Sequence, residues 1–169
     1  MKTQFDEVNA PPTWKPLNPS EKLLIYGIGN VGRQDDGLGI KLIEMLEMIS
    51  LPSTVSLDAN YQLNIEDALL MSNYDVVVFV DASAETGGLM PFSIQPIHPR
   101  SEIAFSTHAM SMQGVLSLCE ELYERIPRVF LLALPGYSWE ISEELSEGAK
   151  LNLNLAFQYL MEELKESCA

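Results

Sequence analysis

The chain of 169 residues is poor in positive charge, in cysteine, in histidine and in long apolar runs. It has 10 lysines and arginines against 24 aspartates and glutamates, and the resulting net charge of −14 repels nucleic acid. We therefore expect no nucleic-acid partner. No apolar run approaches the roughly 20 residues needed to cross a bilayer, so we expect no membrane-spanning segment.

The cysteines and the first residues exclude further classes of protein. Cys119 and Cys168 are 49 positions apart, which fits neither a disulfide framework nor a zinc motif, and we expect both to be free thiols. Residues 1–21 carry four prolines and lack the apolar core of a secretory signal. We expect them to form a flexible arm ahead of one domain over residues 22–169, in a cytoplasmic protein that is monomeric when free.

The stretch from Leu23 to Leu46 organises the rest of the chain. Its apolar start, its glycines and the helical spacing of apolar residues after Gly37 predict a buried strand, a turn and a helix. Asp35 and Asp36 lie in the turn, where the carboxyl end of the strand meets the amino end of the helix. In open α/β sheets, ligands bind at this edge.

The remaining pattern alternates strands and helices. Further strands are expected over Thr54–Asp58, Val76–Val80, Met90–Ile97 and Arg128–Leu134, and further helices over Leu63–Met71, Met110–Arg125 and between Ser142 and Lys165. Pro91 and Pro96 place the Met90–Ile97 strand at an edge. The order predicts a single-domain α/β fold: a three-layer sandwich whose mostly parallel, doubly wound five-stranded sheet has helices on both faces.

Titratable side chains gather at the predicted strand ends. Asp36 follows the first strand, Asp81 follows the third, and His108 precedes the helix after the fourth. Because the third strand should neighbour the first, Asp36 and Asp81 are expected to face one crevice. Two carboxylates and an imidazole suit a divalent transition metal, with open positions for water or substrate.

The same residues have simpler interpretations. Asp35 or Asp36 could cap the helix that follows, and Asp81 could end its strand with an Asx turn. A single loop histidine is usually solvated, which is what we expect of His98.

Two other binding functions use the same opening stretch. The pattern Gly27-x-Gly29-x-x-Gly32 matches a dinucleotide-binding loop, with Asp58 as the acid that would bind the ribose. Asp35 and Asp36 oppose it, because carboxylates repel a pyrophosphate at that position. A phosphoacceptor receiver domain also has an acidic pair there, but it needs a lysine after its fifth strand, and this chain has none between Lys41 and Lys150.

Four short motifs occur in order: Gly27-x-Gly29-Asn30, Asp35-Asp36-Gly37-x-Gly39, Val80-Asp81-Ala82 and Ser106-Thr107-His108. Together they resemble the hydrogenase maturation endopeptidases, the nickel-recognising peptidases of family M52. The similarity extends to Pro135 and to Leu145-Ser146, and it covers nearly all of the chain after Glu21.

The resemblance implies an endopeptidase of aspartyl or metallo type that activates another enzyme. Members remove a C-terminal extension from the large-subunit precursor of [NiFe] hydrogenase after nickel insertion. Carried over by position, the catalytic and metal-binding residues are Asp36, Asp81 and His108. The nickel would be supplied by the precursor, and no nucleotide is expected. Further candidates for contacting the substrate or supporting these three are Gly29, Asn30, Asp35, Asp58 and Asn60.

The chain departs from the family after its second strand. Many members have an Asp-Gly-Gly turn where this chain has Asp58-Ala59-Asn60-Tyr61-Gln62, a loop that we expect to help select the partner. Nickel could be catalytic or only a recognition tag. The alternative to proteolysis is a metal-dependent chaperone that binds the precursor without cutting it.

Overall fold

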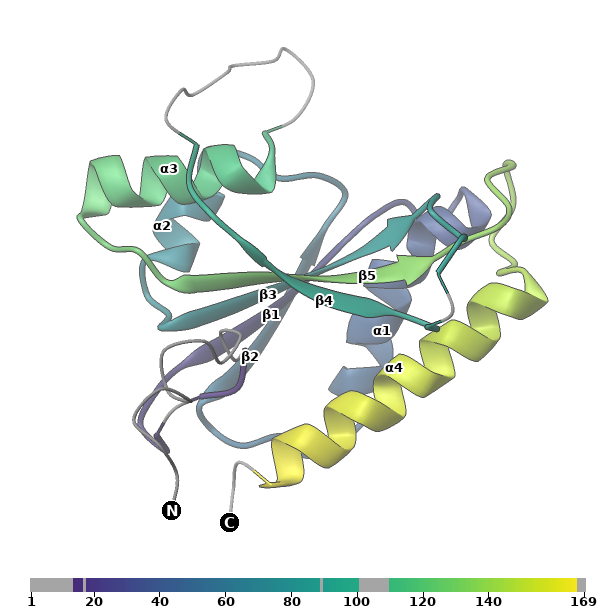
Figure 1. Cartoon of the computed structure of the whole chain (residues 1–169), viewed down its shortest axis with the longest axis horizontal. Helices are drawn as coiled ribbons and strands as arrows, with labels where there is room; N and C mark the ends of the chain where they lie inside the picture. Colours follow the sequence, from purple (N-terminus) through teal and green to yellow (C-terminus); the bar gives the residue numbers. More distant parts are fainter. Residues whose placement is uncertain (1–13, 17, 89, 101–109, 167–169) are drawn as a thin grey trace, which may run out of the picture.

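The computed structural model describes residues 14–16, 18–88, 90–100 and 110–166 (Figure 1). Its strands are β1 (Leu23–Ile28), β2 (Val55–Asn60), β3 (Val76–Ser83), β4 (Ser93–Ile97) and β5 (Arg128–Pro135). Its helices are the 3-10 helix η1 (Gln34–Gly37), α1 (Leu38–Glu47), α2 (Asp67–Met71), α3 (Met112–Tyr123) and α4 (Glu147–Glu166). The order of strands and α-helices is the predicted one.

The strands form one sheet in the order β2-β1-β3-β5-β4. The first four in this order run parallel, and β4 pairs antiparallel with β5 at an edge of the sheet. The predicted α/β fold, the neighbouring positions of β1 and β3 and the edge position of the proline-containing strand are all confirmed. Because the parallel strands end at the same edge, the loops that follow β1, β2, β3 and β5 lie together.

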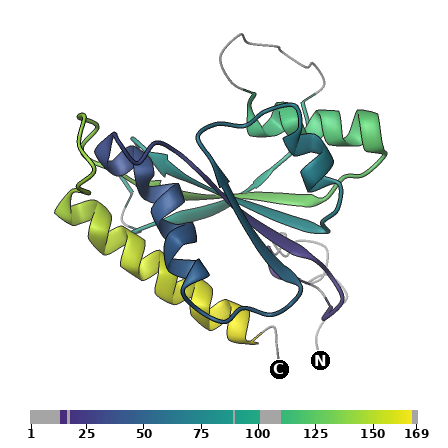
Figure 2. The ribbon, with the colours of Figure 1, turned by 180° about the vertical axis from the view of Figure 1, so that it is seen from behind.

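Helices cover both faces of the sheet. Helices α1 and α4 pack together on one face, and α2 and α3 pack together on the other (Figures 1 and 2). Alternate residues of β1 enter different cores, so that Leu23 and Ile25 pack under α1 and α4 while Leu24 and Tyr26 pack under α2 and α3. Burial on both faces explains why the apolar residues of β1 and β3 do not alternate with polar ones.

Helix α1 lies unusually close to the sheet. A Cβ atom added to Gly39 would come within 2.4 Å of the carbonyl oxygens of both Ile28 and Val80. Only glycine fits this contact, which places the amino end of α1 against the carboxyl ends of β1 and β3.

Several element boundaries differ from the predicted ones. The helix predicted over Leu63–Met71 is helical only over Asp67–Met71, because the Asp67 carboxylate accepts a hydrogen bond from the Asn64 amide and holds a turn there instead. Helix α3 ends at Tyr123, where Glu124 takes a left-handed conformation with φ 53°. A local side-chain hydrogen bond sets the start of α2, and the chain reversal at Glu124 sets the end of α3. The spacing of apolar residues does not set either end.

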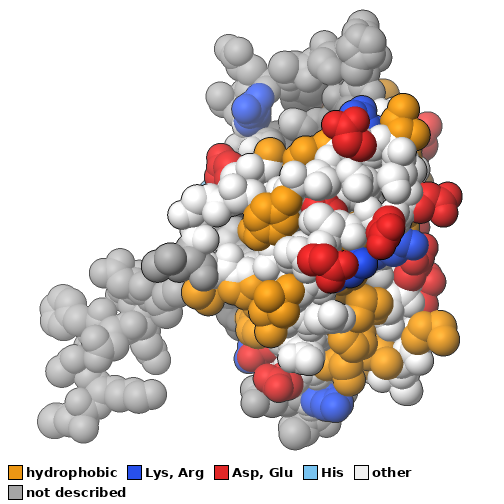
Figure 3. Space-filling model, turned by 90° about the vertical axis from the view of Figure 1, so that its right-hand side faces the viewer, with side chains coloured by type: hydrophobic (Ala, Val, Ile, Leu, Met, Phe, Trp, Pro, Cys, Tyr) orange, Lys and Arg blue, Asp and Glu red, His pale blue; other side chains and the backbone are white. Residues whose placement is uncertain are grey.

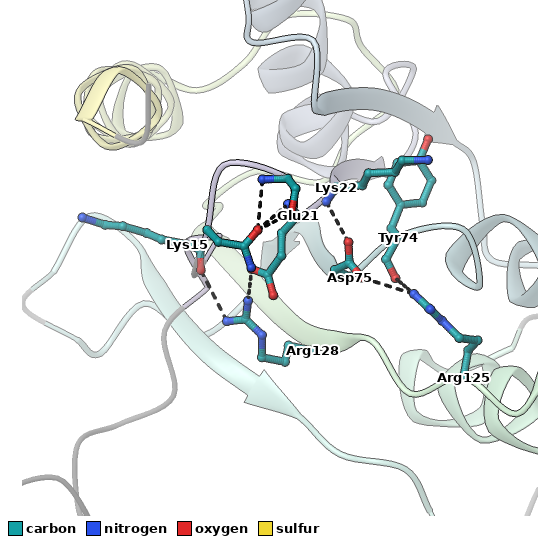
Figure 4. A network of polar contacts seen from close by, with 9 residues as sticks. Lys15, Glu21, Lys22, Tyr74, Asp75, Arg125 and Arg128 are labelled. Carbon is teal, nitrogen blue, oxygen red and sulfur yellow. Dashed lines mark hydrogen bonds and ion pairs between the residues drawn. The ribbon is translucent and has the colours of Figure 1, made fainter. Parts of the chain in front are cut away.

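Part of the segment predicted as a loose arm over residues 1–21 is instead attached to the domain. The Trp14 side chain is 5% exposed, and its indole donates a 3.1 Å hydrogen bond to the Tyr159 hydroxyl of α4. Lys15 pairs with Glu163 of α4, and the Arg128 guanidinium donates to the Lys15 carbonyl (Figure 4). Trp14, Lys15 and Glu21 thus tie this segment to the domain, although residues 18–20 are exposed, and residues 1–13 and 17 lie outside the described residues.

Cys119 is a buried free thiol, as predicted, and burial raises its pKa. Cys168 lies outside the described residues. None of the described helices is long and apolar enough to cross a bilayer.

Candidate active site at the carboxyl edge of the sheet

Asp36 and Asp81 are brought together at the carboxyl edge of the sheet. Asp36 lies in η1, between β1 and α1, and Asp81 lies near the end of β3. Burial, which has the largest effect, and the charge of Asp36 raise the pKa of the Asp81 carboxyl to about 6, although a hydrogen bond from the Ala82 amide lowers it. The two side chains are therefore close enough to interact electrostatically, as the strand order predicted.

The main chain of Asp36 is fixed while its carboxylate is not. Its amide donates to the Arg33 carbonyl at 3.2 Å, and its carbonyl accepts from the Asn30 amide at 3.1 Å. Among the described residues, none donates a hydrogen bond to the Asp36 carboxylate, and no Lys, Arg or His pairs with Asp36 or Asp81. Within that part of the chain the negative charge of the pair is uncompensated, which suits the binding of a cation.

The third predicted ligand, His108, lies outside the described residues. Within the described ranges, no group of three or more His, Cys, Asp or Glu side chains is arranged to hold a metal ion. The set of three therefore stays a prediction. His98, at the end of β4, has an exposed side chain, as expected of a solvated residue.

Asp35 has a role that its sequence context did not reveal. Its side chain is fully buried, and its carboxylate accepts from the amides of Tyr137, Ser138 and Ser146 at 2.7, 3.0 and 2.8 Å. The Ser146 hydroxyl donates a fourth bond at 2.6 Å. Burial alone would raise the pKa of Asp35, but these four hydrogen bonds outweigh it and hold the pKa below its ordinary value. Asp35 thus holds the loop between β5 and α4.

More hydrogen bonds join the same two segments. The Gln34 amide donates to the Ser142 carbonyl at 2.7 Å, and the Gln34 side chain accepts from the Glu140 amide at 3.0 Å. The Ser142 amide donates to the Gly32 carbonyl, and the Arg33 guanidinium donates to the Trp139 carbonyl. Gln34 is held at φ 46°, an uncommon value for a residue other than glycine. The loop that carries Asp36 and the loop after β5 therefore form one unit.

The remaining candidates line the edge of the sheet beside β2. Gly29 has φ 148°, and a Cβ there would lie 2.0 Å from the Asp36 carbonyl oxygen, so glycine is required. The Asn30 side chain accepts from the Gly32 amide and donates to the Tyr61 hydroxyl, and the Asn60 carbonyl accepts from Gly29. These residues shape the loops around Asp36. Asp58 is exposed, and its carboxylate accepts the Ala59 amide.

The geometry of the glycine loop does not favour the dinucleotide interpretation. In that motif the third glycine packs the helix closely on the strand. Here Gly32 lies in a turn six positions before Leu38, the first residue of α1, and Gly39 makes the close contact. Asp36 lies two positions before Leu38, at the amino end of the helix where the pyrophosphate would have to lie.

The chain is similar in structure to several solved proteins. Over 86% of this chain and 93% of the other, it matches a [NiFe] hydrogenase maturation protease, HycI from Thermococcus kodakarensis, with 27% identity and a TM-score of 0.67. The hydrogenase maturating endopeptidase HybD from E. coli gives the same coverage and TM-score at 22% identity, which shows the fold alone. A hydrogenase 2 maturation peptidase from a Thaumarchaeota archaeon has 23% identity and a TM-score of 0.63, over 86% of this chain and 99% of the other.

No family model and no curated protein matches the chain by sequence. The 27% identity to HycI over most of both chains, together with the shared fold, makes the chain a peptidase, an enzyme of the hydrolase class. The resemblance predicted from the motifs is confirmed by the structural comparison: the chain is similar to hydrogenase maturation proteases, with 27% identity to HycI.

Proposed function

We propose that this peptidase removes the C-terminal extension from a nickel-loaded large-subunit precursor of [NiFe] hydrogenase, and that Asp36, Asp81 and His108 bind the nickel of that substrate. The observation that carries the proposal is that η1, with Asp36, packs against β3, with Asp81, at the edge where β1 and β3 end. The similarity to HycI over most of both chains supports it.

The chemistry of this site follows from its two carboxylates. Oxygen ligands and an imidazole accept a divalent transition-metal ion and leave coordination positions for groups of the precursor. A nickel ion of the precursor held by these residues would orient the extension, and it would supply Lewis-acid chemistry at the scissile carbonyl or at a water molecule. Cys119 is a poor candidate for the nucleophile, because its thiol is buried in α3 and burial raises its pKa.

Cleavage is tested by mixing the purified full chain with nickel-loaded precursor and weighing the product by mass spectrometry. Asp36→Ala, Asp81→Ala and His108→Ala should each slow processing by ~100-fold or more, because loss of a ligand exceeds the 10- to 100-fold effect of its supporting groups. Glu47→Ala, an exposed carboxylate at the far end of α1, is the matched control and should process normally.

The possible outcomes separate the alternatives. Normal processing by His108→Ala would overturn the assignment of the three ligands. A precursor that forms a complex with the wild type but keeps its mass would favour the metal-dependent chaperone. Circular dichroism of each variant shows whether the fold is intact.

A further inference from the structure

We propose that the precursor docks on the loop of residues 136–146 and the amino-terminal half of α4, a surface that we call the docking face. Its apolar contacts are Tyr137, Ile141, Leu151 and Leu155, and its acidic contacts are Glu140 and Glu143. The partner surface that fits it is apolar and flanked by lysine or arginine. The inference rests on the proposed function and names the chemistry of the partner at that site.

Large apolar side chains are exposed on the docking face. Ile141 is 91% exposed, Leu151 is 61% exposed and Tyr137 is 50% exposed. A single exposed apolar residue is ordinary, but several on adjoining elements are typical of a protein-binding surface. Figure 3 shows this side of the molecule, where apolar and acidic side chains lie next to one another.

The loop and the helix form one continuous surface. Leu151 and Leu155 are four residues apart and therefore lie on one face of α4. Gly148 lies on the same face and contacts the Tyr137 ring, since a Cβ at this position would be 2.7 Å from a ring carbon. The Tyr137 hydroxyl accepts a 3.0 Å hydrogen bond from the Asn152 side chain. Tyr137 thus joins the loop to the helix.

The loop is held by many hydrogen bonds although it exposes apolar residues. Asp35 holds it at both ends, through the amides of Tyr137 and Ser138 and through Ser146. The amides of Glu140 and Ser142, on either side of Ile141, are bonded to Gln34 and Gly32. Binding to a loop that is already ordered loses little conformational entropy, which is how a recognition surface gains affinity.

The docking face begins beside the carboxylate pair. The Gly136 amide donates a 2.8 Å hydrogen bond to the Ser83 carbonyl, two residues beyond Asp81 in β3. At the other side, Asp35 is the chain neighbour of Asp36. A partner seated on the loop therefore reaches the edge of the sheet where we place the nickel of the precursor.

The charge of the docking face calls for a basic partner. Glu144 and Glu147 pair with Lys150. Glu140 and Glu143 are exposed and form no ion pair with another described residue. Complementary charge across an interface speeds association and selects the partner, and its effect weakens with salt.

The test measures both binding and cleavage of the nickel-loaded precursor by the full-length chain. Ile141→Asp should weaken the Kd, measured by calorimetry, at least tenfold and raise KM while leaving kcat within about twofold. Met48→Asp is the matched control, because Met48 is 85% exposed at the carboxyl end of α1 and the variant gains the same charge. Ile141→Val should bind like the wild type. Glu140→Lys combined with Glu143→Lys should weaken binding most at low salt.

Each outcome decides between the two proposals. If the wild type cuts the precursor and Ile141→Asp keeps its Kd and KM, the docking face is wrong and the proposed function stands. If the wild type binds without cutting and Ile141→Asp loses binding, the docking face stands and proteolysis of this precursor is wrong. If the wild type neither binds nor cuts, both proposals are overturned, and an equal loss in Met48→Asp overturns the docking face.

Discussion

Asp35 and Asp36 are neighbours in the chain but have different surroundings. The Asp35 carboxylate is fully buried and accepts four hydrogen bonds from the loop after β5. The Asp36 carboxylate is half-buried and faces the charge of Asp81 instead. A carboxylate with all its hydrogen bonds made stabilises the structure. Two carboxylates without a cationic partner among the described residues repel each other, and a bound cation reduces that repulsion.

The carboxyl group of Asp81 should make stability depend on pH. Its folded pKa of about 6 lies above its ordinary value of 3.8, so the folded state binds the proton more tightly than the unfolded state. The contribution of Asp81 to stability should therefore fall as the pH rises from about 4 through 6. Asp81→Asn keeps the oxygen that accepts the Ala82 amide and removes the charge, and at pH 8 it should be more stable than the wild type by about 3 kcal/mol.

Urea unfolding at pH 4 and pH 8, with a chelator present, measures this difference. The chelator matters because a bound metal would stabilise the wild type. At pH 4 Asp81 is protonated in the folded state and about half ionised in the unfolded state, so the two proteins should differ by less than about 1 kcal/mol. Asp58→Asn, which removes an exposed carboxylate, should change little at either pH. Equal stability of Asp81→Asn and the wild type at pH 8 would show that ionising Asp81 in the folded protein does not destabilise it.

At the scale of elements, the position of α1 fixes the site. Gly39 lets the first turn of α1 contact the carbonyls of Ile28 and Val80, the residue before Asp81. The same contact holds η1, and with it Asp36, beside the end of β3. Close packing of a helix on two strands therefore sets the spacing of the two carboxylates.

Gly39→Ala should disturb this packing. A methyl group 2.4 Å from two main-chain oxygens forces α1 away from the sheet, because main-chain atoms of a central strand pair cannot yield cheaply. We expect the free energy of unfolding to fall by about 2 kcal/mol or more, in spite of the higher helix propensity of alanine. Thermal unfolding by circular dichroism measures it.

Gly87→Ala is the control for this variant. Nothing lies within 4 Å of a Cβ added at Gly87, so this change should leave stability within about 0.5 kcal/mol. A Gly39→Ala protein as stable as Gly87→Ala would show that α1 does not depend on the close contact.

At the scale of the whole molecule, the first described residues are tied to the last helix. Trp14 lies in the core cluster under α4, and its ring contacts the Tyr159 ring at 6.1 Å between centroids. Arg128 of β5 pairs with Glu21, and Asp75 pairs with Arg125, at the amino edge of the sheet (Figure 4). This end of the molecule is stabilised by contacts between distant segments, while the opposite edge carries the carboxylates.

Trp14→Ala should destabilise the domain by about 3 kcal/mol, the low end for removing a buried aromatic side chain. The loss comes from the apolar contacts with α4 and from the hydrogen bond to Tyr159. Chemical denaturation monitored by circular dichroism measures it. Ile141→Ala is the comparison, since a side chain that is 91% exposed should contribute almost nothing to stability. If the stability of Trp14→Ala were unchanged, the prediction of a loose arm would be supported instead.

Part of the site could be predicted because it follows from strand order. Asp81 directly follows one apolar run and Asp36 lies in the turn after another, and parallel strands bring such ends to one edge. The role of Asp35 could not be predicted in this way, because its partners lie more than 100 positions away. Nothing local in the sequence separates a carboxylate that holds a distant loop from one that caps a helix.

The sequence by itself determined the alternation of strands and helices, the α/β class, the edge strand and the ordered motifs of the family, because apolar periodicity and turn residues act locally. Only the tertiary structure decided where Trp14 lies, that Gly39 and not Gly32 makes the close helix contact, and which carboxylate is buried. These outcomes depend on which distant segments meet. Burial and hydrogen-bond partners are properties of that assembly, and no short stretch of sequence contains them.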